Sequence, residues 1–244
     1  MISWPPGYHR KGYAELDSTN EEARRLAEGG EQGPLWITAA RQTAGRGRRG
    51  RPWDTGAGNL AATLLLRPEA AQSAVGQLSF AAALAVADMA AHFAPAASIS
   101  VKWPNDVLAE GKKLAGILLE GGTAKSGQRW LAIGIGVNLA HHPEGTEFPA
   151  TSLPQLGVAS ASCEAALTVL AARFAHWYDA WMRDGFETLR QAWLARASGL
   201  GGPITARLPH ETRAGMFEGI GASGALLLNE QGQVHAIAAA EVFF

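Results

Sequence analysis

The sequence contains a single cysteine, Cys163, among 244 residues. An intrachain disulfide needs two cysteines, so none can form, and this agrees with a reducing, cytoplasmic environment. The longest apolar run, Phe80 to Ala94, is interrupted by Asp88 and His92 and falls short of the roughly 20 residues that cross a bilayer. The first residues also lack the apolar centre of a secretory signal. We therefore expect neither secretion nor membrane insertion.

An excess of charge of either sign is also missing, since 21 lysines and arginines face 22 aspartates and glutamates. A protein dominated by nucleic-acid binding is expected to be basic, so the near-neutral balance argues against that class. Hydrophobic residues make up 47% of the chain, enough for one large domain, alone or with a small second one. Against this neutral background, four arginines crowd into GRGRRGRPW, residues 45–53.

The order of predicted elements indicates an α+β fold, because strand hairpins and helices mix without strict βαβ alternation. Ser18 with Glu21, or Thr19 with Glu22, predicts a capping box that begins a helix ending at Gly29-Gly30. Helices are expected over 73–93, 164–183 and 186–196, and strands over 35–41, 59–66, 98–102, 107–109, 114–120 and 130–139. From Gly199 short strands and glycine turns predict a five-stranded barrel. We expect domains at 1–198 and 199–244.

Three interpretations fit the arginine-rich stretch taken alone. It is a solvated basic loop, a nucleic-acid patch, or a clamp for anions in which glycines let the backbone approach and arginine forks bind carboxylate or phosphate. It is not a Walker loop, because G-x-x-x-x-G-K-[ST] is absent. Gly45, Gly47 and Gly50 match the letters of a dinucleotide-binding loop, but no convincing helix follows.

KWPND, residues 102–106, has an ordinary and a functional interpretation. Asn and Asp after Pro are common turn residues at the end of a strand. Alternatively, Lys102 binds a phosphate while Asn105 and Asp106 hold Mg²⁺, which prefers one or two carboxylates plus substrate phosphates.

GKKLAGIL and GIGVN, which begin at residues 111 and 134, divide in the same way. The lysines fit an exposed hairpin turn, or Lys113 points inward and Gly116 leaves room for a ligand. Glycines inside a strand mark a bulge or a close backbone approach. Gly134 fits the second case, and Asn138 then has an amide that can contact a base edge.

Together these motifs identify a family resemblance. DSTN, QTAGRGRRGRPW, KWPNDV, KKLAGIL and GIGVNL occur in the order and spacing found in bacterial biotin protein ligases, the biotin–[acetyl-CoA-carboxylase] ligases. The resemblance implies an α+β sheet like that of class II aminoacyl-tRNA synthetases and lipoate ligases, with helices on one face, followed by a small SH3-like β domain. The chain lacks the N-terminal helix-turn-helix of regulatory members, so we expect a ligase-only type and no DNA partner.

The family joins biotin to ATP as biotinyl-5′-AMP and then transfers biotin to one lysine of a biotin carboxyl carrier domain, with Mg²⁺ as the metal. Bringing two anions together requires fixed cations in a desolvated site. By the family's pattern, the catalytic residues are Arg48, Lys102, Asp106 and Lys113. Biotin contacts Ser18, Thr19, Asn20, Gln42, Gly45, Arg46, Gly47, Arg48, Lys113, Gly116 and Gly134. The ATP or adenylate contacts Arg46, Arg48, Arg49, Arg51, Trp53, Lys102 and Asn138. The metal contacts Asn105 and Asp106.

Two rival functions remain at this point. A lipoate or octanoate ligase of the same fold is the nearest enzyme alternative, although the arginine-glycine loop beside KWPND favours biotin. A nucleic-acid-binding module predicts steeply salt-dependent DNA affinity and no pyrophosphate release. The sequence leaves a homodimer open.

Overall fold

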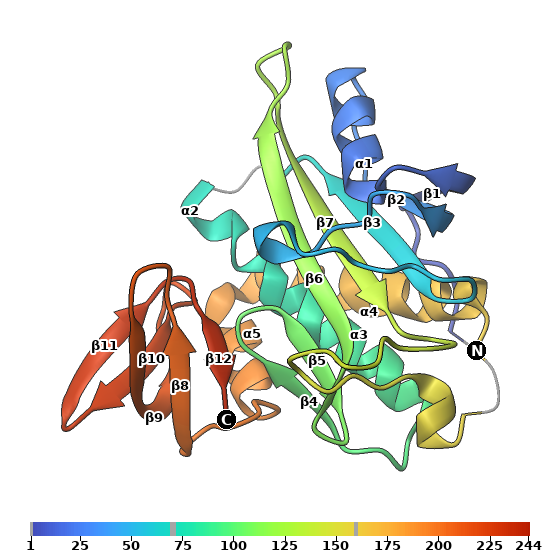
Figure 1. Ribbon diagram of the computed structural model, residues 1–244. Coiled ribbons are helices and arrows are strands. Elements are labelled where there is room, and N and C mark those ends of the chain that lie inside the picture. Colours follow the sequence, from blue (N-terminus) through green and yellow to red (C-terminus); the bar gives the residue numbers. More distant parts are fainter. Residues whose placement is uncertain (1, 69–71, 159–160) are drawn as a thin grey trace.

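A seven-stranded sheet forms the centre of the computed structural model, which describes residues 2–68, 72–158 and 161–244 (Figure 1). The strand order is β1-β2-β3-β7-β6-β5-β4. Only β1 and β2 are parallel, and the other neighbours are antiparallel. In chain order the strands are β1 (His9–Leu16), β2 (Leu35–Gln42), β3 (Leu60–Leu66), β4 (Ile99–Lys102), β5 (Asp106–Ala109), β6 (Lys112–Thr123) and β7 (Arg129–Val137).

Helices cover both faces of this sheet. α3 (Leu78–Phe93), α4 (Cys163–Asp184) and α5 (Phe186–Leu194) belong to the main core with one face of β3, β6 and β7. α1 (Thr19–Glu28) buries Ala23 and Ala27 against Ile37 and Leu65 on the opposite face. The expectation that all helices lie on one face is therefore wrong for α1. α1 packs against β2, β3 and β7, so the rest of this face of the sheet is free for a site.

Two details of the predicted helices differ in the structure. Ser18 occupies the N-cap position of α1, but its side chain makes no capping hydrogen bond, and the carboxylate of Glu22 pairs with Arg25 instead. The helix predicted over 73–93 is divided into α2 (Gln72–Val75) and α3 by a turn at Gly76. Glycine loses more freedom than alanine in a helix, which favours the break there.

One strand was not predicted at all. β1 forms the edge of the sheet, pairs with β2 from His9 to Leu16, and exposes most of its side chains. With neither face fully buried, its sequence carries no apolar alternation that would mark a strand.

A second sheet follows from Pro203, with five antiparallel strands in the order β11-β10-β9-β8-β12. Its strands are β8 (Pro203–Arg207), β9 (Thr212–Ile220), β10 (Leu226–Glu230), β11 (Gln233–Ile237) and β12 (Glu241–Phe243). Trp103 Nε1 donates to Gly224 O at 3.1 Å, and the buried side chains of this sheet continue the main core. The predicted α+β fold with a small C-terminal β domain is confirmed.

Candidate active site

A cavity of about 580 Å³ lies on the α1 face of the seven-stranded sheet, a volume in the usual range for small-ligand sites. The loop between β2 and β3, which includes the short 3₁₀ turn Arg48–Gly50, crosses this face in front of β6 and β7 (Figure 1). Among the residues that sequence reasoning selected, those lining the cavity are Ser18, Thr19, Asn20, Gln42, Arg46, Gly47, Arg48, Arg49, Arg51, Trp53, Lys102, Asn105, Asp106, Lys113, Gly116, Gly134 and Asn138. Segments far apart in the chain therefore meet here.

Gly45 is the one selected residue that does not line the cavity. A Cβ on it would overlap the carbonyl oxygen of Trp53 and stand 2.8 Å from Gln42 Nε2. Its own carbonyl accepts the amide of Trp53 at 2.9 Å. Gly45 therefore closes the base of the arginine loop, where only a residue without a side chain fits.

Glycines on the floor of the cavity make room for two side chains. A Cβ at Gly134 would overlap the carboxamide of Asn20, and one at Gly136 would overlap the indole of Trp53. Gly116 also lies under Trp53, because a Cβ added to it would stand 3.2 Å from the indole ring. Gly136 was not selected from the sequence, although it shares a face of β7 with Gly134 by the two-residue period.

Neutral polar groups line one end of the cavity in a buried network. Gln42 Oε1 accepts the amide of Thr19 at 2.8 Å. Thr63 Oγ1 lies 2.8 Å from Thr19 Oγ1 and donates to Asn20 Oδ1 at 2.6 Å. Ser18, Thr19, Asn20 and Thr63 are at most 5% exposed. A network fixed in this way suits a neutral ligand with several hydrogen-bonding groups.

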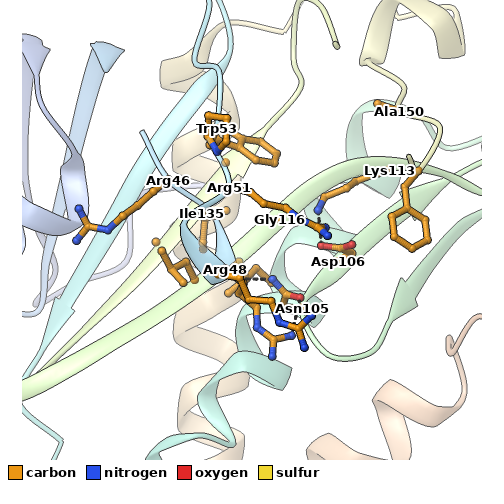
Figure 2. A pocket seen from close by; sticks show the side chains of 18 of the residues that line it. Arg46, Arg48, Arg51, Trp53, Asn105, Asp106, Lys113, Gly116, Ile135 and Ala150 are labelled. Atoms are coloured by element: carbon orange, nitrogen blue, oxygen red, sulfur yellow. Dashed lines mark hydrogen bonds and ion pairs between the residues drawn. The ribbon is translucent and has the colours of Figure 1, made fainter. Parts of the chain in front are cut away.

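Arg46 pairs with carboxylates at that end. Its Nη2 lies 3.2 Å from Glu120 and 3.3 Å from Glu21. Glu120 also accepts Asn20 Nδ2 at 2.8 Å. Figure 2 shows Arg46 pointing away from the Lys113–Asp106 pair. In this structure Arg46 therefore fixes the loop to α1 and β6.

Arg49 and Arg51 pair with the C-terminal sheet. Glu241, on β12, lies 2.9 Å from Arg51 and 3.4 Å from Arg49. Arg51 is also 3.6 Å from Glu147, which pairs with Arg207 at 2.9 Å. The network joins the loop between β2 and β3, the segment after β7 and the second sheet at the rim of the cavity.

Lys113 and Asp106 face each other inside the cavity, with 2.7 Å between Nζ and Oδ1 (Figure 2). Both side chains are largely buried, at 27% and 14% exposure. Asn138 supports this pair from behind: its Nδ2 donates to the carbonyl of Thr151 at 3.0 Å and lies 3.5 Å from that of Lys113. The amide of Asn138 thus already has backbone partners, and its assignment to a base edge stays a prediction.

Arg48 has no carboxylate partner among the ion pairs of the described residues. Its nearest polar contact is Asn105 Oδ1, at 3.4 Å. Asn105 is itself held by donation to Ile117 O at 2.7 Å. Burial, and secondarily the charge of Arg49, lowers the pKa of Arg48.

Lys102 is the second such cation. It is 4% exposed, and its ammonium lies 3.2 Å from the ring centre of Phe148. Within the described ranges it has neither an ion pair nor a hydrogen bond at Nζ. Burial lowers the pKa of Lys102 to about 8, although Asp106 opposes the shift. Burying a charge without a counterion is costly, so an anion bound beside Lys102 and Arg48 would offset that cost.

The proposed metal ligands supply one carboxylate and one amide oxygen. Asp106 is paired with Lys113, and Asn105 faces Arg48. No group of three or more His, Cys, Asp or Glu side chains with metal-binding geometry occurs in the described part of the chain. The donor set is too small for a cage made of protein alone, but it fits Mg²⁺ whose shell is completed by substrate phosphates.

Several residues of the site were missed by sequence reasoning. Thr63, Glu120, Glu147, Phe148 and Glu241 all touch a selected residue. Thr63 had a usable signal, since it is the one polar residue in an apolar strand. The others lie outside every motif.

No helix among the described residues is long and apolar enough to cross a membrane.

The comparisons with known proteins agree with this geometry. Residues 13–138 match the biotin/lipoate A/B protein ligase family, and residues 199–244 match the biotin protein ligase C terminal domain. The chain is 47% identical to the biotin–[acetyl-CoA-carboxylase] ligase of Paracoccus denitrificans, over 95% of this chain and 98% of that protein. It is 32% identical to the bifunctional ligase/repressor BirA of Bacillus subtilis, over 97% of this chain and 74% of that protein.

Among solved structures, the biotin protein ligase of Aquifex aeolicus in complex with biotin and ATP superposes with a TM-score of 0.84. It is 26% identical to this chain and covers 96% of it, and 98% of its own length is matched. The two family matches together include the motifs that line the cavity and the second sheet. The chain therefore belongs to the biotin protein ligase family and is an enzyme of the ligase class.

Proposed function

We propose that this chain activates biotin with ATP as biotinyl-5′-AMP and transfers it to a lysine of the biotin carboxyl carrier domain of acetyl-CoA carboxylase or a related carboxylase. The observation that carries this proposal is a buried Lys102 and a half-buried Arg48 beside a neutral hydrogen-bonding pocket, neither of which has a carboxylate partner among the described residues. A ligand that combines a neutral polar ring with an anionic end fits such a site.

The neutral end suits the ureido ring of biotin. Ser18, Thr19, Asn20 and Gln42 supply hydroxyl and amide groups there, held in place by Thr63. Gly134 keeps the space that Asn20 needs. The biotin carboxylate then extends toward Lys113 and Arg48.

In the first step a carboxylate oxygen of biotin attacks the α-phosphorus of ATP, and the bond to the pyrophosphate oxygen breaks. Lys113 binds the biotin carboxylate, for which it must leave Asp106. Lys102 and Arg48 neutralise charge on the phosphates where the two anions approach each other. Arg49, Arg51 and Trp53 extend the nucleotide site, and Arg46 holds the loop over biotin.

Asp106 and Asn105 would hold a Mg²⁺ ion that accompanies the nucleotide, and the bound ion would supply neutralisation of phosphate charge. In the second step the amine of the carrier lysine attacks the acyl carbon of the adenylate, and AMP leaves. In this proposal Asp106 orients that amine and accepts its proton. We place this reaction in the cytoplasm, in keeping with the single cysteine.

The test is pyrophosphate release by the purified chain with ATP, Mg²⁺ and either biotin or lipoate, followed by transfer of label to a carrier domain. We expect release with biotin only and one biotin added per carrier. Pyrophosphate release with lipoate but not with biotin would identify the chain as a lipoate ligase of the same fold. Absence of release with either acid would refute the ligase proposal.

A further inference from the structure

A stack of two cations and two aromatic rings crosses the rim of the cavity. The Lys102 ammonium lies 3.2 Å from the ring centre of Phe148. The ring of Phe148 stacks on that of Phe243, with 4.7 Å between centres and 22° between planes. The Arg207 guanidinium lies 4.3 Å from the centre of Phe243, and the Lys102 ammonium is also 5.9 Å from that centre and 5.4 Å from the centre of Phe244. Each ring therefore has a cation over it.

The stack joins three separate parts of the chain. Lys102 ends β4, Phe148 belongs to the segment after β7, and Phe243 and Arg207 lie on the neighbouring strands β12 and β8. The segment that carries Phe148 is tied to β6, because the amide of Lys113 donates to Pro149 O at 2.8 Å. Both ends of the stack are thus fixed to sheets.

Four other cations of the cavity differ from Lys102 in their partners. Arg46, Arg49, Arg51 and Lys113 each lie within 3.4 Å of a carboxylate. A carboxylate neutralises a cation and competes with an incoming anion. An aromatic face attracts an ammonium through its quadrupole but carries no net charge. The N–H groups that point away from the ring do not contact it and can still donate hydrogen bonds. Lys102 therefore keeps both its charge and its donors for a ligand.

We propose that Phe148 and Phe243 are positioning residues of the reaction, whose stacked rings hold the Lys102 ammonium toward the phosphates of the nucleotide. This inference rests on the proposed ligase function and adds two residues to it. Phe148 contacts Lys102 directly, and Phe243 supports Phe148 from the C-terminal sheet. The second sheet thereby acts on the nucleotide site through an aromatic contact.

The test weakens the ring's attraction without changing its shape. Phenylalanine analogues with increasing fluorine content are incorporated at position 148, and pyrophosphate release is measured against ATP and against biotin. We expect kcat/KM for ATP to fall stepwise with each fluorine, by about twofold to thirtyfold over the series. The KM for biotin should stay constant. The same series at Phe93, a half-buried ring on α3, is the matched control and should be flat.

A second arm links the effect to the cation. In a Lys102→Met background the slope with fluorine content should vanish, and Phe243→Leu should lower kcat/KM for ATP while Phe243→Tyr restores it. A flat series at Phe148, or an equal slope without Lys102, would overturn the proposal while leaving the ligase function intact. Failure of the unmodified chain to release pyrophosphate would instead remove the function on which the proposal rests.

Discussion

Lys113 Nζ lies 2.7 Å from Asp106 Oδ1, at the point in the cavity where the two reacting anions are expected to meet. The pair neutralises itself until a ligand separates it. Lys113 attracts an incoming carboxylate and Asp106 repels it. Substituting each residue alone and both together separates the two effects.

Lys113→Ala should lower biotin-dependent pyrophosphate release by about 10²- to 10³-fold, the usual cost of losing one preorganised charge-stabilising donor. The loss has two parts, since the change removes a cation and leaves Asp106 as an unpaired carboxylate facing anions. Adding Asp106→Asn to this variant should therefore recover biotin affinity, measured by titration calorimetry. Equal biotin affinities in the single and double variants would show that Asp106 does not repel the ligand.

The pH dependence of the reaction should report Lys102. Burial lowers its pKa to about 8, so the ammonium is present below that pH and is lost as pH rises through it. We expect kcat/KM for ATP to decline above about pH 8. Bound phosphate favours the charged form, so the decline in kcat should occur at higher pH. Lys102→Arg should abolish the decline, because arginine stays charged, and its persistence in that variant would assign it to another group.

Gly134→Ala should disturb the neutral end of the cavity. The added Cβ overlaps the Asn20 carboxamide, so Asn20 must leave its hydrogen bonds with Thr63 and Glu120. Overpacking of this kind costs about 1–3 kcal/mol, and we expect a lower free energy of unfolding in urea together with weaker biotin binding. Gly76→Ala is the matched control, because a Cβ there meets nothing within 4 Å. Biotin affinity equal to that of the control would contradict the assignment of Asn20 to biotin.

Glu241→Gln should loosen the arginine loop. The glutamate, 15% exposed, is the shared partner of Arg49 and Arg51, and its neutral analogue holds them less strongly. Trypsin, which cleaves after arginine, should cut the ligand-free loop faster in this variant, and biotin with ATP should restore protection. Glu211→Gln, a change of the same kind in the turn between β8 and β9, is the control. Unchanged cleavage of the loop in Glu241→Gln would show that the network does not hold it.

The motifs of the sequence selected residues that line one cavity, but they left out the residues that hold those side chains in place. Lys102, Arg48 and Lys113 belong to dense local patterns, and the elements that carry them were placed to within a few residues. Glu241 and Phe148 are single residues outside every motif, and the cavity cations that they contact lie at least 46 positions away in the chain. Only folding brings such residues together, and the local periodicity of the sequence does not report contacts between distant positions.

The same limit applied to the fold. Apolar runs identified β3, β7 and α3 because burial imposes composition on them. β1 was not predicted because its backbone pairs with β2 while most of its side chains are exposed to water. The sequence pattern also did not predict which face of the sheet each helix covers, since α1 lies opposite to α3, α4 and α5.

The glutamates around the cavity explain how a chain with a net charge of −1 can carry the anion site that we propose. Arg46, Arg49 and Arg51 are balanced internally before any ligand arrives. A phosphate that reaches them displaces a carboxylate of the protein rather than an ion from solution. Binding of the nucleotide is then an exchange of partners, and its dependence on salt concentration should be shallower than the number of arginines suggests.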